Sequence, residues 1–119
     1  MVFDERLSIL RGGDVISAGV ETQVRRVIAR LEDRWQIKLT EENGGRMVTH
    51  LAMALMRIER GEEIRAPEDS ILDEFYSLGV FPLSEEIVND LVKWIPVDLP
   101  KAEQDYLKVN ICLLLDRDA

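Results

Sequence analysis

The stretch Arg46-Met47-Val48-Thr49-His50-Leu51-Ala52-Met53-Ala54-Leu55-Met56-Arg57-Ile58 contains the single histidine of the chain. At about 100° per residue, five of its apolar side chains share one arc of a helix: Met47, Leu51, Ala54, Leu55 and Ile58. His50 lies at the edge of this arc, and Arg46 and Arg57 fall within about 40° of it on the helical wheel. The stretch therefore predicts a helix that places one titratable ring at the border of a core, between two guanidinium groups.

A neutral imidazole is a nucleophile, and flanking arginines suit it to an anion such as a phosphoryl group. His50 is therefore a candidate phosphoacceptor. The spacing alone favours an ordinary boundary histidine, because charged stripes are common on the surfaces of helices.

The composition predicts one globular domain in a reducing compartment. The chain has 119 residues, and its net charge of −8 argues against nucleic acid or an anionic membrane as a partner. The one cysteine, Cys112, rules out an intrachain disulfide, which fits a cytoplasmic protein. We see neither a signal peptide nor an apolar segment long enough to span a membrane.

The apolar periodicity predicts an all-α fold, because no segment alternates with period two over a useful length. We expect a single domain over residues 1–119, with a short N-terminal extension (1–14) that contains a short helix and a compact five-helix bundle (15–117). The five main helices are expected at Ser17 to about Trp35, Thr40 to Gly61, Pro67 to Leu78, Ser84 to Pro96, and Pro100 to about Asp116.

Ser17, Thr40 and Ser84 are expected to cap their helices, and Gly61 to stop one. The pair Gly44-Gly45 leaves two alternatives open. These glycines either permit close helix packing or move the true start of the helix to a later residue.

The last predicted helix also contains Asn110 and Cys112, whose side chains are polar and polarizable, respectively. Asn110 lies near the centre of an apolar face, so its amide needs a partner, either a neighbouring backbone group or a group across a cleft. Cys112 points away from that face and is expected to be inert packing.

Two motifs on two of these helices resemble the PTS regulation domain, or PRD, over about residues 15–117. The first reads His50-Leu51-Ala52-Met53-Ala54-Leu55-Met56-Arg57-Ile58-Glu59-Arg60-Gly61. The second reads Leu99-Pro100-Lys101-Ala102-Glu103, then Tyr106-Leu107, then Asn110. Each motif alone is weak, but their order, their separation and the helical context make the pair moderately specific.

The resemblance implies a cytoplasmic, usually homodimeric helical regulator of the bacterial phosphoenolpyruvate:sugar phosphotransferase system. Its histidines accept phosphoryl groups from the phosphocarrier HPr or from a sugar-specific IIB component, and an effector that regulates transcription responds. His50 matches the first phosphoacceptor, Arg57 the motif arginine and Glu103 the motif glutamate. Arg46, Arg57, Asn110 and Glu103 are the candidates for contact with the ring or with its phosphoryl group.

This sequence departs from the family pattern at two positions and lacks an attached effector domain. Asn110 stands where the second phosphoacceptor is expected, and Thr49 stands where an acidic residue often precedes the first. A separate transcriptional regulator is therefore the expected partner. If Asn110 faces His50 across a cleft, its amide could hydrogen-bond the ring or the phosphoryl group.

Two alternatives stay open. One is a degenerate domain, a helical dimer that binds a partner regulator without phosphorylation. The other is a magnesium-dependent helical hydrolase with an acidic cluster made of Glu59, Glu62, Glu63, Glu86 and Asp90. The spacing of these acids is poor, and one histidine with one cysteine makes a zinc site or a nucleophilic pair improbable. We expect a regulatory domain that is not an enzyme, with no catalytic residue, metal or cofactor.

Overall fold

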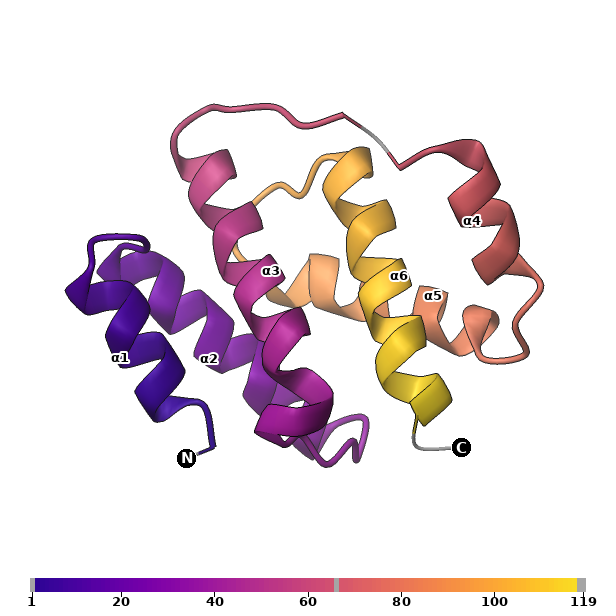
Figure 1. Cartoon of the computed structure of the whole chain (residues 1–119), viewed down its shortest axis with the longest axis horizontal. Helices are drawn as coiled ribbons and strands as arrows, with labels where there is room; N and C mark the ends of the chain where they lie inside the picture. Colours follow the sequence, from indigo (N-terminus) through magenta and orange to yellow (C-terminus); the bar gives the residue numbers. More distant parts are fainter. Residues whose placement is uncertain (1, 66, 118–119) are drawn as a thin grey trace. The chain divides into compact units, whose positions relative to one another are not determined.

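The described part of the chain is all-α, as the periodicity predicts, but it has six helices rather than five. The computed structural model describes residues 2–65 and 67–117 (Figure 1). Among these residues no strand is found. The helices are α1 (Asp4–Gly12), α2 (Ala18–Asp33), α3 (Glu41–Glu59), α4 (Asp69–Tyr76), α5 (Phe81–Trp94) and α6 (Lys101–Arg117).

Contacts divide the chain into an N-terminal unit that ends at Glu63 and a C-terminal unit that begins at Ile64. In the N-terminal unit α1 packs on α2, and α2 packs on α3 (Figure 1). In the C-terminal unit α6 contacts both α4 and α5. Over the described residues, no helix has both the length and the apolar content needed to cross a bilayer.

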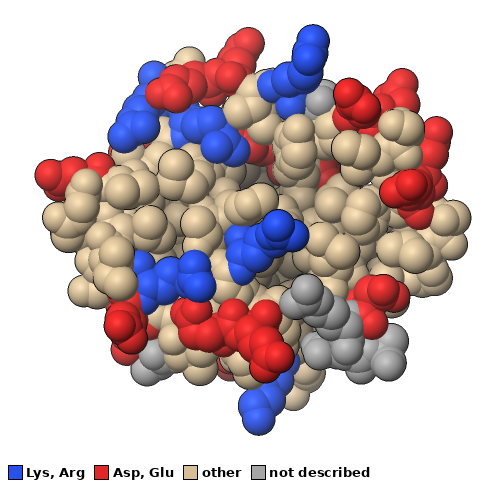
Figure 2. Space-filling model, viewed as in Figure 1, with Lys and Arg blue, Asp and Glu red and all other residues tan. Residues whose placement is uncertain are grey.

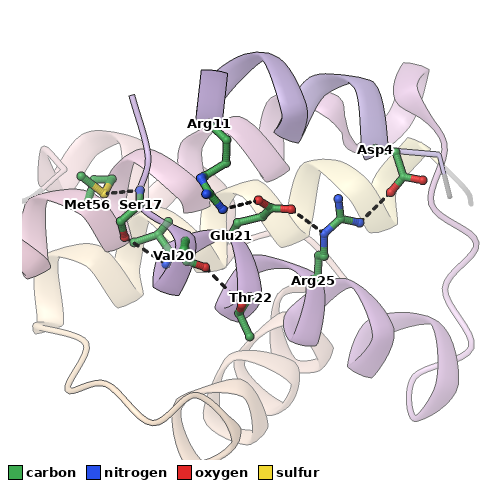
Figure 3. Close-up of polar contacts among 9 residues, drawn as sticks. Asp4, Arg11, Ser17, Val20, Glu21, Thr22, Arg25 and Met56 are labelled. Atoms are coloured by element: carbon green, nitrogen blue, oxygen red, sulfur yellow. Dashed lines mark hydrogen bonds and ion pairs between the residues drawn. The ribbon is translucent and has the colours of Figure 1, made fainter. Parts of the chain in front are cut away.

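The helix that the count of five left out is α1, which belongs to the packing of the N-terminal unit. Leu7 is fully buried and Phe3, which precedes the helix, is 1% exposed. A chain of ion pairs also links α1 to α2 (Figure 3). Asp4 binds Arg25, Arg25 binds Glu21, and Glu21 binds Arg11 across 2.6, 3.0 and 2.8 Å. The segment expected to be an extension is therefore an integral part of this unit.

Both ends of α3 follow from the sequence. Thr40 accepts a hydrogen bond from the Asn43 backbone, and Asn43 Oδ1 accepts one from Thr40 N, so the two residues form a capping box. At the other end Gly61 has φ +74°, a conformation that glycine adopts without steric cost. Its N–H and that of Glu62 bond to the last carbonyls of the helix, as in a Schellman motif. The prediction that Gly61 stops the helix is confirmed.

The start of α5 differs from the prediction. The helix begins at Phe81, so Ser84 lies inside it and is not its cap. The Ser84 side chain is fully buried, and its hydroxyl donates to Lys108 O of α6 across 2.7 Å. The prediction for Ser84 was wrong because a serine before an apolar run is equally suited to a polar tie between two helices.

Candidate functional site

His50 lies on the exposed side of α3, beside the buried face that the periodicity predicts. Met47, Leu51 and Ala54 are buried, whereas the His50 side chain is exposed. Within the described part of the chain, no hydrogen bond or ion pair occupies the imidazole. Solvent and a second molecule can therefore reach the imidazole side chain.

The two arginines of the same stripe differ in their surroundings. Arg46, one turn before His50, is exposed and has no hydrogen-bond or ion-pair partner among the described residues. Arg57, two turns after His50, is half-buried in the last turn of α3 and does have an interaction partner. An anion at His50 would therefore find Arg46 available without breaking an existing ion pair.

The first half of α3 carries a second polar cluster, built by α1, that lies next to His50 in the sequence. Arg6 of α1 binds the Glu41 carboxylate with two of its nitrogens, at 2.7 Å for Nη2 and 3.1 Å for Nε. Its Nη1 donates to Thr49 Oγ1 across 2.8 Å. The hydrogen bond to Glu41 raises the pKa of Arg6, and the same bond lowers the pKa of Glu41. Thr49 directly precedes His50 in the sequence. Arg6 therefore links α1 to the residue next to the candidate phosphoacceptor.

The two glycines at the start of α3 make this approach possible. A Cβ at Gly45 would lie 2.8 Å from Arg6 Nη2, and one at Gly44 would lie 3.2 Å from Phe3 Cζ. The helix nevertheless begins at Glu41, before both glycines. Of the two alternatives that the sequence left open, the structure supports close packing, since residues of the α1 segment lie over the glycines.

The C-terminal unit holds the remaining two candidate residues, both on α6. Asn110 is half-buried, and its Nδ2 donates to Tyr106 O, one turn earlier, across 3.0 Å. The partner of this amide is thus a backbone group of its own helix. Glu103 is 5% exposed and interacts within the protein. A contact of Asn110 or Glu103 with His50 stays a prediction.

The structure also shows where the residues of the alternative hypotheses lie, namely the cysteine and the five acids suggested for a magnesium site. Cys112 is buried, and this burial raises the pKa of its thiol, which favours the unreactive protonated form. The five acids suggested for a magnesium site are divided between the α3 end and α5. Across residues 2–65 and 67–117, no three His, Cys, Asp or Glu side chains are grouped as a metal site would require. Figure 2 shows acidic side chains close to basic ones on the face in view.

Sequence reasoning missed Arg6. This residue lies 35 positions before Glu41 and 43 before Thr49, so no local pattern links it to α3. The pair Gly44-Gly45 was the one available signal, because two glycines in a helix indicate that another element comes close.

Comparison with known proteins supports one family. Residues 25–111 match the family model described as the PRD domain. A protein from Haemophilus influenzae, described as uncharacterized, is 38% identical over 89 residues, which are 71% of each chain. The Escherichia coli K12 protein described as uncharacterized protein YhfY is 28% identical over 108 residues, 91% of this chain and 90% of the relative. No solved structure matches the chain.

Proposed function

Because this chain belongs to the PRD domain family, we propose that it is a regulatory domain of the phosphoenolpyruvate:sugar phosphotransferase system with His50 as its one phosphoacceptor. The family is regulatory rather than enzymatic, and the motif around His50 is the one that carries phosphoacceptor histidines in it. The observation that carries the proposal is the exposed His50 ring, one helical turn from the exposed and unpaired Arg46 of the described chain.

The proposed transfer needs only an unprotonated ring nitrogen and an activated donor. With HPr as the donor, the His50 nitrogen attacks the phosphorus of the phosphohistidine that HPr carries. A new P–N bond forms as the donor's P–N bond breaks, and the bonding pair of the old bond returns to the donor's imidazole. The Arg46 guanidinium would then form charge-assisted hydrogen bonds with the added phosphoryl oxygens.

The consequence of this modification is regulatory. A phosphoryl group adds about −1.5 to −2 charges at neutral pH and three strong acceptor oxygens. On an exposed helix face such a change can bias an interface that has two arrangements of similar free energy. We place that interface in a cytoplasmic homodimer that acts on a separate transcriptional regulator.

A second function, binding without phosphorylation, is favoured by Asn110. An amide cannot take up a phosphoryl group as a histidine does, and here it bonds to the backbone of its own helix. In this alternative the domain keeps its fold and its partner, and binding does not depend on the state of the phosphotransferase system.

Intact mass measurement separates the two functions. The protein is incubated with phosphoenolpyruvate, enzyme I and HPr, with and without IIB components. One added, acid-labile phosphoryl group that is lost in His50→Ala is the expected result. Since His50 is exposed and makes no hydrogen bond or ion pair within the described chain, we expect the free energy of unfolding of His50→Ala to lie within about 0.5 kcal/mol of wild type. No addition from any donor would favour the binding function.

Arg46→Ala and Arg57→Ala form a matched pair for the role of the arginines. Both remove one guanidinium from the same helix stripe. We expect Arg46→Ala to slow phosphorylation or to shorten the lifetime of the phosphoryl group more than Arg57→Ala, because Arg57 is half-buried and already engaged. Equal effects would assign no particular role to Arg46.

A further inference from the structure

The helix α1 and the two residues before it present two apolar faces, and only one of them is used by the fold. Phe3 and Leu7 are 1% and 0% exposed, whereas Val2 and Ile9 on the other side are 49% and 66% exposed. Ile9 is the most exposed large hydrophobic residue of the described chain. Exposed apolar side chains that gather on one element are typical of a surface that meets a partner.

These two side chains line a cavity of about 430 Å³ between α1 and the first half of α3. Its wall also includes Arg6, Glu41 and Thr49. Arg6 and Glu41 neutralise each other through the bidentate ion pair, so this part of the wall offers no unpaired charge to a ligand. Leu10 and the exposed carboxylate of Glu5 complete the lining. The surface is thus a groove with exposed apolar side chains and one exposed acid besides the ion-paired Glu41, and we call it the α1–α3 groove.

The α1–α3 groove adjoins the candidate phosphoacceptor. Thr49 lines it, His50 follows directly in the sequence, and on the helical wheel Arg46 falls between these two residues. A specific protein interface covers about 800 Å² on each partner. A protein whose phosphohistidine meets His50 therefore covers neighbouring surface as well, and the groove lies within that reach.

We infer that the α1–α3 groove is the docking site of the protein that donates the phosphoryl group to His50, an inference that rests on the proposed function. Val2 and Ile9 supply the apolar anchors. Arg46 supplies the charge that complements the donor's phosphohistidine, since it is exposed and unpaired within the described chain. Both anchors, Val2 just before α1 and Ile9 within it, lie outside residues 25–111, the part that matches the family model.

Two phosphoryl donors of different size test the inference. Phosphorylated HPr must dock, whereas phosphoramidate is small and needs no surface beyond His50 itself. With phosphoramidate, the His50 nitrogen attacks the phosphorus and the P–N bond of phosphoramidate breaks. The leaving nitrogen takes up a proton and departs as ammonia. The rate of phosphorylation by each donor is measured by intact mass on the full chain, for wild type, Ile9→Glu and Ser8→Glu.

Ser8→Glu is the matched control because Ser8 is an exposed residue of α1 that does not line the groove. We expect Ile9→Glu to slow transfer from phosphorylated HPr about tenfold or more, the size of effect that an interface anchor gives. Transfer from phosphoramidate, and both transfers in Ser8→Glu, should stay within about twofold of wild type, as is usual for surface changes. The thermal unfolding midpoint of each variant checks that α1 remains folded.

Three results would overturn the inference. Equal slowing with both donors means that Ile9 acts on His50 itself, and no slowing with phosphorylated HPr means that the donor docks elsewhere. A change of oligomeric state in Ile9→Glu, measured by sedimentation, means that a second copy of the chain occupies the groove. If neither phosphorylated HPr nor phosphoramidate modifies wild type, the proposed function fails, and the docking inference fails with it.

Discussion

Arg6 Nη1 donates a hydrogen bond of 2.8 Å to Thr49 Oγ1, and so joins α1 to the residue that precedes His50 on α3. The guanidinium reaches Thr49 by lying over Gly45, where a Cβ would come within 2.8 Å of Nη2. The stability of α3 and the docking of α1 are therefore coupled at one backbone position.

Substitution Gly45→Ala tests this coupling. Alanine at this helical position stabilises by about 1 kcal/mol relative to glycine. The displaced Arg6 loses an exposed ion pair worth about 0–1 kcal/mol. We expect a net change below about 1 kcal/mol in wild type and a stabilisation of about 1 kcal/mol in the Arg6→Ala background, both measured by urea unfolding. Identical effects in the two backgrounds would contradict the coupling.

Substitution Gly44→Ala should behave differently, because its neighbours belong to the core. The new Cβ would lie 3.2 Å from both Phe3 Cζ and Leu39 Cδ2, and both side chains are 1% exposed. Overpacking of this kind costs about 1–3 kcal/mol, against the same helical gain of about 1 kcal/mol. We expect destabilisation of up to about 2 kcal/mol by urea unfolding, with partial rescue by Phe3→Leu. A stabilised Gly44→Ala would refute this packing.

Acid should weaken the link between α1 and α2. The hydrogen bond from Arg25 lowers the pKa of the Asp4 carboxyl and also that of Glu21. A carboxyl whose folded-state pKa is lowered contributes stability above its unfolded pKa of about 4, and this contribution is lost as the pH falls through the folded value. The difference in unfolding midpoint between wild type and Arg25→Gln should therefore be largest near neutral pH and shrink below about pH 4.

The control for this experiment is Arg60→Gln. Arg60 is exposed in the C-cap of α3, and its side chain takes no part in the ion pairs of Asp4 and Glu21. Its difference from wild type should not follow the same pH dependence. If the two variants follow one pH profile, the acid effect belongs to the net charge of the chain and not to Arg25.

The thiol of Cys112 should be unreactive in the folded protein. It is fully buried in α6, and this burial raises its pKa. A disulfide reagent near neutral pH should modify it only at the rate at which the protein opens, with full reaction in denaturant. Rapid labelling without denaturant would show that this part of α6 is open to solvent.

The sequence predicts helices best where caps and core agree. The core side of α2 has apolar residues at intervals of one, three and four positions, and Val20, Val24, Val27, Ile28 and Leu31 are all buried. Ser17 caps it as expected, accepting a hydrogen bond from Val20 N. The Ser17 cap and the apolar periodicity predict the same helix, and the contacts of the folded chain agree with both.

The sequence-based predictions failed at residues whose role is set by partners far away in the sequence. The role of Ser84 is set by a carbonyl of α6, 24 residues away, and that of Arg6 by two residues of α3. Asn110 is the intermediate case. Its need for a partner was evident from the apolar face, and of the two alternatives left open the structure shows the neighbouring backbone group. The spacing of the residues could not predict that the backbone partner would be Tyr106 O.

The helix α2 has a practical consequence for anyone who cuts this protein into pieces. The family match begins at residue 25, in the middle of Ala18–Asp33. A fragment trimmed to that boundary would lose the Ser17 cap, two buried valines and every contact of α1. It would begin as a frayed half-helix, and its α3 would carry two helix-weakening glycines without Phe3 and Arg6 packed over them. The boundary of a family model and the boundary of a stable folding unit are here different places.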